Sequence, residues 1–366
     1  MKKLWIFVFL MTITFPIWGT RHDADAKSID IDENFPDFYF QTYVKKKFDT
    51  NKDGKLSDKE RRAVTEIDVG RPSEYRLDWE YPAPDTLEGI EFFPNLKKLF
   101  CAESYLGVLD VSKNLKLEEL NCRFNNLEEL NLQNNRNLKK LYCGYNKLKN
   151  IDVSKNKNLE IFYCNDNKIK KINLSKNKKI TSLLVSCNKL QKLNIKGLTQ
   201  LQILCCGENK LKKLDVTHNK KLITLECDTN KLTKLNVSKN KLLDYLHVGN
   251  NAIRKLDLSK NKLLQTFCCN DNQLLTGNVK LSRTQLERCE ASTQKATLKI
   301  KKIGKYYYLP LPNVLGTNVI SNLSYGKLTS KGIRVKKSTL PKTITYEYNM
   351  FTDGEEKTKV TIRTKK

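Results

Sequence analysis

A repeat with a constant period constrains this chain more than any other feature of its 366 residues. An aliphatic residue begins each of nine consecutive repeats, always 21 residues after the previous one. These residues are Leu96, Leu117, Leu138, Leu159, Ile180, Leu201, Leu222, Leu243 and Leu264. We number the positions of each repeat from 1 to 21, starting at this residue. A constant period without insertions indicates a solenoid, in which every repeat forms one turn of the same shape.

A single repeat is too small to fold in isolation. It buries about six apolar side chains, for a gross gain of about 1.5–3 kcal/mol per side chain. Ordering its 21 residues costs about 1–2 kcal/mol per residue, which exceeds this gain. Neighbouring repeats must therefore cover each other's core. The spacing L-x-x-L-x-C-x-x-N-x-L is typical of leucine-rich repeats, and it predicts a mainly β solenoid over residues 96–292.

The repeat pattern also indicates which side chains face the core. Positions 4 and 6 are apolar, so we expect them to point inward from a short strand, with position 5 exposed on the concave face. Position 9 is Ser104 in the first repeat and asparagine in the other eight. An asparagine amide both donates and accepts, so it suits backbone groups where the chain leaves the strand. The lack of long helical patterns predicts a second short strand or an extended turn on the convex side.

Most cysteines occupy one position of the repeat. Position 6 carries Cys101, Cys122, Cys143, Cys164, Cys206, Cys227 and Cys269, whereas Val185 and Val248 take the same place in two repeats. Because valine substitutes for cysteine there, we expect free, buried thiols that act as small apolar side chains. Parallel side chains on neighbouring strands also match disulfide geometry poorly. The pattern assigns no role to the cysteines outside this column, which are Cys187, Cys205, Cys268 and Cys289.

A second motif precedes the repeats. Residues 49–60 read D-T-N-K-D-G-K-L-S-D-K-E and fit the twelve-residue loop of an EF-hand, with Gly54 at the sharp turn. The predicted oxygen ligands come from Asp49, Asn51, Asp53, Lys55 (through its backbone carbonyl), Ser57 and Glu60. Calcium takes six to eight hard oxygen ligands, so the loop predicts one structural Ca²⁺ ion. The alternative is a polar helix cap that holds no metal.

The other segments complete five predicted parts of the chain. Residues 1–26 have a basic start, an apolar run and a small-residue cleavage site, which predict a secretory signal peptide. Residues 27–67 form the EF-hand-like segment, and residues 68–95 form the N-terminal cap of the solenoid. Residues 293–366 alternate between apolar and polar, with a turn at Asp353-Gly354. They predict a small antiparallel β domain, sandwich-like or immunoglobulin-like, that covers the open end of the solenoid.

Aromatic residues gather on the predicted concave face of the early repeats. They lie at positions 5 and 8, and they are Phe100, Phe124, Tyr142, Tyr145 and Tyr163. Exposed aromatic side chains in one patch are typical of a recognition surface, which favours a protein or glycan ligand. The alternative is that these rings only pack against one another along the sheet.

Lysines form two further columns in a chain whose formal charge is +27. Position 10 carries Lys147, Lys168, Lys189, Lys210 and Lys231. Position 13 carries Lys171, Lys192, Lys213, Lys234 and Lys255. Like charges at strand spacing repel, so the arrangement favours an anionic polymer as a partner. The alternative is a lysine-rich composition with no ligand, and nucleic acid is not expected because the chain is predicted to be exported.

One row of residues resembles a catalytic or metal site. Cys205, Glu226, His247 and Cys268 all occupy position 5 of consecutive repeats. A thiol, an imidazole and a carboxylate can form an activated nucleophile, and the same groups can bind zinc. However, a row on adjacent strands does not converge on one substrate atom, and the sequence shows no oxyanion donors. We therefore expect a protein that is not an enzyme.

Together, these motifs resemble a known family. The single calcium loop, the half-repeat at residues 87–95 and the cysteine-bearing 21-residue units are similar to internalin-like leucine-rich repeat surface proteins of Gram-positive bacteria. The resemblance covers about residues 33–290 and implies a monomeric, extracellular binding protein. Its ligand would be a protein or glycan at the cell surface. Many such proteins carry an L-P-x-T-G wall anchor, but here Leu340-Pro-Lys-Thr343 is followed by Ile344, so no such anchor is expected.

Overall fold

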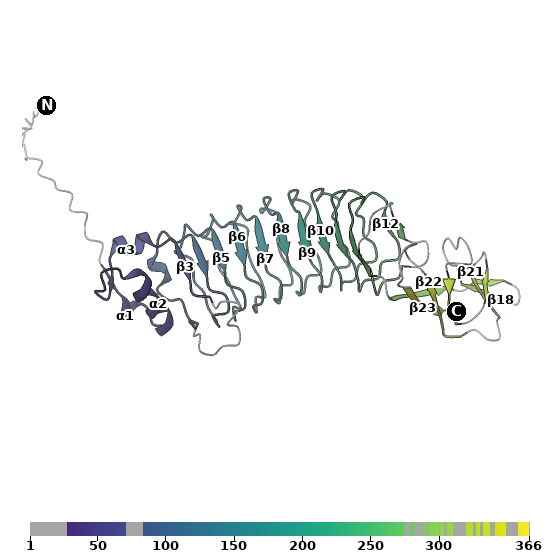
Figure 1. The fold of residues 1–366 in the computed structure, drawn as a ribbon, viewed down its shortest axis with the longest axis horizontal. Helices are drawn as coiled ribbons and strands as arrows, with labels where there is room; N and C mark the ends of the chain where they lie inside the picture. The colour runs from purple at the N-terminus through teal and green to yellow at the C-terminus, as the bar shows by residue number, and fades with distance from the viewer. Residues whose placement is uncertain are drawn as a thin grey trace, which may run out of the picture.

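The computed structural model describes residues 28–70, residues 83–274 and a set of shorter segments toward the C-terminus. These segments are 279–281, 288–290, 293–299, 301–303, 306–309, 320–324, 327–329, 332–336, 341–348 and 358–365. The predicted signal peptide and the predicted turn at Asp353-Gly354 lie outside the described residues. The molecule is elongated, with helices at its N-terminal end, a long row of strands in the middle and a small β unit at its C-terminal end (Figure 1).

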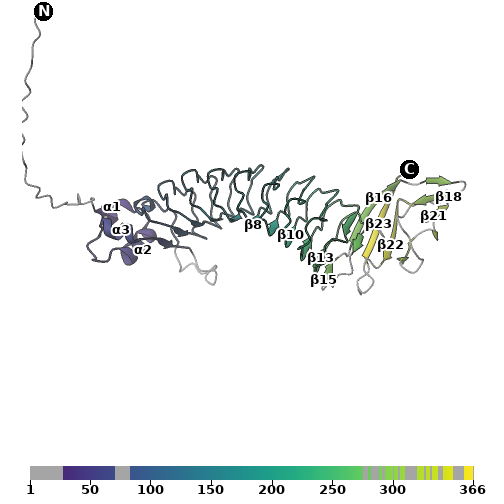
Figure 2. The same cartoon turned by 90° about the horizontal axis from the view of Figure 1, so that it is seen from above.

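A parallel sheet of eleven described strands forms one face of the solenoid. Each strand pairs in register with the strand of the next repeat, so Leu141 of β6 (Lys140–Tyr142) lies opposite Phe162 of β7 (Ile161–Tyr163). The other strands are β3 (Glu66–Asp68), β4 (Lys98–Phe100), β5 (Glu119–Asn121), β8 (Ser182–Leu184), β9 (Ile203–Cys205), β10 (Thr224–Glu226), β11 (Tyr245–His247), β13 (Thr266–Cys268) and β15 (Arg288–Glu290). The repeats follow a shallow arc with this sheet on its inner side (Figure 2). The predicted mainly β solenoid is confirmed.

The core is one continuous stack of side chains that runs from the N-terminal helices to Leu274. In β6, Leu141 and the following Cys143 are fully buried, whereas Tyr142 between them is half-buried and faces outward. The same alternation recurs in the other repeats except the last, where Cys268 at position 5 is buried, so the prediction for positions 4 and 6 is confirmed and that for position 5 holds in eight of the nine repeats. The ten cysteines whose side chains the structure describes are all free thiols. Burial raises the pKa of the Cys122 thiol to about 12, so this column consists of unreactive core thiols.

Buried asparagines at position 9 fasten each repeat to the previous one. The Nδ2 of Asn188 donates to the backbone carbonyl of Cys164 at 2.9 Å. Its Oδ1 accepts from the backbone N–H of Ile169 at 3.0 Å. Both partners belong to the previous repeat, and the equivalent bonds recur along the solenoid, as for Asn146. The predicted role of position 9 is therefore confirmed.

A second column of asparagines, at position 19, was not assigned from the sequence. The Nδ2 of Asn177 donates to the backbone carbonyls of Val153 and Asn156, both at 2.9 Å. The column consists of Asn114, Asn135, Asn156, Asn177, Asn219, Asn240 and Asn261, all fully buried. Leu198 takes this position in the repeat that begins at Ile180, so the column is interrupted there.

Helices and short strands cover the N-terminal end of the core. They are β1 (Ile29–Asp30), α1 (Ile31–Asn34), α2 (Phe38–Phe48), β2 (Lys55–Leu56), α3 (Asp58–Ala63) and the 3-10 helix η2 (Ile90–Phe92). The carboxylate of Asp37 caps α2 by accepting from the backbone N–H groups of its first turn. The rings of Phe35 and Phe48 contact the ring of Phe93 at centroid distances of 6.0 and 5.3 Å. These contacts join the helices to the half-repeat that precedes the first repeat.

The convex side consists mainly of turns. Only one strand pair is found there in the described residues, between β12 (Leu256–Leu258) and β14 (Val279–Leu281). The predicted extended turns are therefore the general case, and a second strand forms only near the C-terminal end of the solenoid.

The C-terminal segments form two sheets of four described strands each. The first contains β16 (Thr293–Lys299), β23 (Thr358–Lys365), β22 (Thr343–Tyr348) and β19 (Ile320–Ser321). The second contains β17 (Lys301–Ile303), β18 (Tyr306–Leu309), β21 (Gly332–Lys336) and β20 (Lys327–Thr329).

The pairing of β16 with β23 is parallel, which corrects the prediction of a purely antiparallel domain. β16 enters this unit directly from the solenoid. The Nε2 of Gln294 in β16 donates to the backbone carbonyl of Cys269 at 2.9 Å, and its Oε1 accepts from the Leu274 backbone N–H at 3.0 Å. Gln294 thus repeats the bonds of a position-9 asparagine, and β16 keeps the direction of the solenoid strands.

Candidate functional site

The aromatic residues of the early repeats form two separate pairs. In the first pair, the rings of Phe124 and Tyr145 stack at a centroid distance of 4.1 Å and an interplanar angle of 11°. The guanidinium of Arg123 lies 5.2 Å from the Phe124 ring centroid, within the range of a cation–π interaction. Tyr145 is nevertheless 39% exposed. The pair therefore combines internal packing with a surface that a ligand can contact.

The second pair lies on the strands themselves. The rings of Tyr142 and Tyr163 meet edge to face at a centroid distance of 5.2 Å. The hydroxyl of Tyr163 lies 3.0 Å from the Oγ of Ser182 in the next strand, so this ring is fixed in orientation. Phe100 ends β4, and Asn121 of β5 separates it from Tyr142. The structure thus places the five predicted aromatic residues on neighbouring repeats but divides them into two pairs and one separate ring.

A feature of position 8 was missed in the sequence. This residue has a left-handed backbone in all nine repeats, although none of the nine is glycine. The residues are Glu103, Phe124, Tyr145, Asp166, Cys187, Glu208, Thr229, Asn250 and Asp271, with φ between 47° and 60°. Position 8 varies too much in residue type to signal this conformation. Because Phe124 and Tyr145 share it in adjacent repeats, their rings lie parallel.

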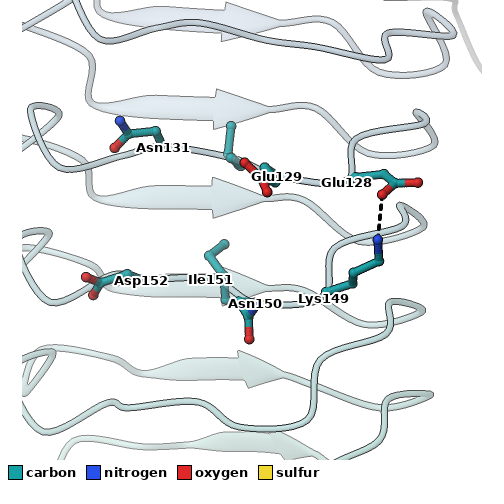
Figure 3. A pocket seen from close by; sticks show the side chains of 8 residues that line it. Glu128, Glu129, Asn131, Lys149, Asn150, Ile151 and Asp152 are labelled. Atoms are coloured by element: carbon teal, nitrogen blue, oxygen red, sulfur yellow. Dashed lines mark hydrogen bonds and ion pairs between the residues drawn. The ribbon is translucent and has the colours of Figure 1, made fainter.

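The lysine columns lie on the surface as predicted, and every lysine of the two columns is exposed. The surface formed by position 10 and positions 12 to 15, which we call the flank, changes its charge along the solenoid. In the early repeats it carries acidic residues, and Figure 3 shows Glu128 paired with Lys149 at 2.7 Å beside a small pocket. Glu129 and Asp152 line the same pocket. The later flank carries mainly lysines, as the groove between residues 191 and 231 shows.

Cys205, Glu226, His247 and Cys268 form one row, as predicted, because their strands pair in register. The chemistry of the row is not that of a nucleophile. Burial and the nearby Glu226 carboxylate raise the pKa of Cys205 to about 12. The Nδ1 of His247 lies 3.6 Å from an oxygen of Asp228, outside the row. In the part of the chain that the structure describes, no three His, Cys, Asp or Glu side chains are arranged to hold a metal ion.

The loop of residues 49–60 makes the sharp turn predicted at Gly54, and hydrogen bonds hold its carboxylates. Gly54 has a φ of +78°, as the sharp turn requires. The carboxylate of Asp49 accepts from the backbone N–H groups of Asp53 (3.2 Å) and Gly54 (3.0 Å), which winds the loop around it. β2, within the loop, pairs with β1, which precedes α1. The chain therefore supplies its own strand where a second EF-hand would otherwise pair.

Glu60, the expected bidentate ligand, is held by hydrogen bonds. One carboxylate oxygen accepts from the N–H and Oγ1 of Thr50 (2.7 and 2.6 Å), and the other accepts from the N–H and Oγ of Ser57 (2.9 and 2.8 Å). Burial alone would raise its pKa, but these four bonds outweigh burial and lower the pKa to about 2. The residue types of the loop fit calcium, whereas the Glu60 carboxylate has to exchange these bonds for the ion.

Comparisons with known proteins add to this geometry. A family profile of leucine-rich repeats in two copies matches residues 136–176. No curated protein matches the chain. Among solved structures, InlJ of Listeria monocytogenes aligns with a TM-score of 0.53 and 20% identity, over 93% of this chain and 99% of that one. The fold is that of an internalin-like leucine-rich repeat protein.

Two other solved structures share the leucine-rich repeat fold. The internalin InlF of Listeria monocytogenes aligns with a TM-score of 0.50 and 17% identity, over 72% of this chain and 97% of its own. A leucine-rich repeat protein of Leptospira interrogans aligns with a TM-score of 0.50 and 24% identity, over 58% of this chain and 68% of its own. The InlJ domain is described as including a cysteine ladder, and this internalin-like chain carries its own column of stacked cysteines at position 6. No helix in the described residues is long and apolar enough to cross a membrane.

Proposed function

We propose that this internalin-like protein is a secreted or cell-surface binding protein that recognises a protein or glycan through its concave face. The main support is the Phe124–Tyr145 pair with Arg123 beside it. Tyrosine, phenylalanine and arginine are the side chains that most often dominate recognition surfaces, and here they are already ordered before a ligand arrives. Ordered side chains lose little conformational entropy on binding, which favours affinity. The fold is typically a scaffold for binding rather than for catalysis.

The test is a pull-down of extracellular proteins and glycans with the full chain and two double variants. Tyr142→Ala/Tyr163→Ala removes the second aromatic pair, and Phe124→Ala/Tyr145→Ala removes the first. A matched control changes two exposed residues of the convex side, Leu242→Ala and Leu263→Ala. We expect at least tenfold weaker capture by one or both aromatic variants and unchanged capture by the control. Equal capture by all four proteins would show that the concave aromatic residues do not bind the ligand.

A rival function is binding through charge alone, as the formal charge of +27 and the lysine columns favour. The two functions respond differently to salt. Binding that depends on surface charge weakens steeply as ionic strength rises, whereas aromatic recognition persists. Capture that survives 0.5 M salt supports recognition by the concave face, and complete loss supports the rival.

We also propose that the loop of residues 49–60 binds one structural Ca²⁺ ion. The support is its sharp turn at Gly54 and its oxygen-rich ligand set, Asp49, Asn51, Asp53, Lys55, Ser57 and Glu60. Thermal unfolding with calcium and with a chelator measures the effect. We expect calcium to raise the melting temperature of the wild type, and to raise it less in Asp53→Asn. This variant keeps the oxygen that accepts from the Lys55 N–H but loses a charge. Equal melting temperatures with and without calcium would refute the proposal.

A further inference from the structure

A groove on the flank of the later repeats carries an unusual concentration of positive charge. It has a volume of about 710 Å³ and crosses three consecutive repeats. The charged residues that line it are Lys192, Lys210, Lys212, Lys213, Lys231 and Asp215. All five lysines are exposed to solvent. The groove is therefore open along the solenoid, and its lining has five positive charges and one negative charge.

These charges lack the compensation that the early flank has. There, Glu128 lies 2.7 Å from Lys149 in the next repeat (Figure 3). Among the described residues, none of the five groove lysines forms an ion pair. The carboxylate of Asp215 does not reach them either, since it accepts from the backbone N–H and Oγ1 of Thr217 at 3.0 and 2.6 Å. The hydrogen bonds from Thr217 lower the pKa of Asp215. Its second carboxylate oxygen lies 3.9 Å from the Nδ1 of His218 and forms no ion pair with a groove lysine.

The arrangement opposes folding unless an anion is present. Successive rungs of a parallel sheet lie about 4.8 Å apart, so lysines at the same position of neighbouring repeats repel each other. A lysine-rich composition alone does not account for the contrast with the second repeat, which carries Glu128 and Glu129 at positions 12 and 13, where the groove carries lysines. The uncompensated lysines therefore point to a ligand that supplies negative charge across several repeats.

We propose that this groove binds a linear polymer of phosphate groups that runs along the solenoid. Lysine ammonium groups are mobile point charges, so they suit repeated phosphates that need no fixed orientation, and no arginine lines the groove. No aromatic side chain lines it either, so it lacks the stacking surface with which proteins hold nucleic acid bases. Leu193 and the lysine stems offer apolar contact to the carbon units between phosphates. This inference is independent of recognition by the concave face.

The test measures binding of long-chain inorganic polyphosphate to the full chain by titration calorimetry at several salt concentrations. The flank variant is Lys192→Gln/Lys210→Gln/Lys213→Gln/Lys231→Gln. The matched control is Lys113→Gln/Lys155→Gln/Lys176→Gln/Lys260→Gln, which changes four exposed lysines at position 18 of the convex side. Each variant has a formal charge of +23, that is, +27 less four. Circular dichroism and the melting temperature verify that both variants fold.

We expect the flank variant to bind polyphosphate at least tenfold more weakly, and its salt dependence to fall by about 3 in the logarithmic slope, since four phosphate contacts are lost. The control should lose less than threefold. Equal losses in both variants would show that total charge, not the groove, binds the polymer, and no loss in either would also overturn the proposal. Tighter binding of single-stranded DNA of equal charge would overturn it as well. A polyol phosphate polymer, compared with polyphosphate in the same assay, identifies which source of phosphate the groove prefers.

Discussion

Replacing one position-9 asparagine tests the hydrogen bonds that join the repeats. In Asn188→Ala, the backbone N–H of Ile169 loses its side-chain acceptor inside the core, whereas the carbonyl of Cys164 keeps a hydrogen bond from the Nδ2 of Asn167. A buried backbone group without a partner costs about 1–3 kcal/mol, so the free energy of unfolding should fall by about 1–3 kcal/mol. Because each repeat contacts only its neighbours, the loss should be concentrated in the two repeats that Asn188 joins.

Urea unfolding followed by circular dichroism measures the total loss, and hydrogen exchange at the Ile169 amide locates it. The control is Asn150→Ala, an exposed asparagine on the flank, which should change the free energy of unfolding by less than about 0.5 kcal/mol. A loss below about 1 kcal/mol for Asn188→Ala, with the Ile169 amide still protected, would refute the account of how the repeats are joined.

Three further predictions concern single residues. The pKa of Glu60 is lowered from 4.5 to about 2, so its stabilising effect should be complete above pH 4.5 and disappear as the pH falls toward 2. In a series of melting temperatures measured at falling pH, Glu60→Gln should lose less stability than the wild type over this range. An identical pH profile in both proteins would contradict the prediction. Thr229 is a β-branched residue with a φ of 47°, a left-handed conformation that asparagine tolerates better. Thr229→Asn should therefore raise the free energy of unfolding, measured in urea, by about 0.5–1 kcal/mol. A lower free energy of unfolding would show that the backbone is not strained at this residue. Burial raises the pKa of Cys205 to about 12, so little reactive thiolate should be present at pH 8. Iodoacetamide should therefore label Cys205 far more slowly in the folded protein than in guanidinium. Equal labelling rates would contradict the raised pKa.

The 21-residue period predicted most of the fold because it depends on local rules. Side chains alternate along a strand, so Leu141 and Cys143 had to face the core once Tyr142 was placed outside. The position-9 asparagines were predictable for the same reason, since their type and place match the chain's exit from the strand.

Other features depend on which residues meet between repeats, and the sequence read repeat by repeat did not reveal them. Lys149 follows Glu128 by 21 residues, so comparing the charges of residues 21 apart would have predicted this ion pair. The same comparison would have shown that Lys213 has another lysine, not an acidic residue, at that separation. The direction of β16 was not predictable from the alternating pattern, because it is set where Gln294 continues the ladder of the solenoid. The hydrogen bonds of Glu60 were also not predicted, because the EF-hand motif specifies which residues bind the ion. It does not specify which groups hydrogen-bond to those residues when no ion is bound.

The gap in the position-19 column has a mechanical consequence. Leu198 has no amide to donate to the carbonyls of the preceding repeat. Among the repeats whose position 19 is described, only the junction between the repeats that begin at Leu159 and Ile180 therefore lacks these two bonds. When a solenoid is pulled from both ends, its repeats separate first at the junction with the fewest hydrogen bonds between them. Under tension, this protein should therefore yield first at that junction, leaving the aromatic pairs on one fragment and the lysine groove on the other.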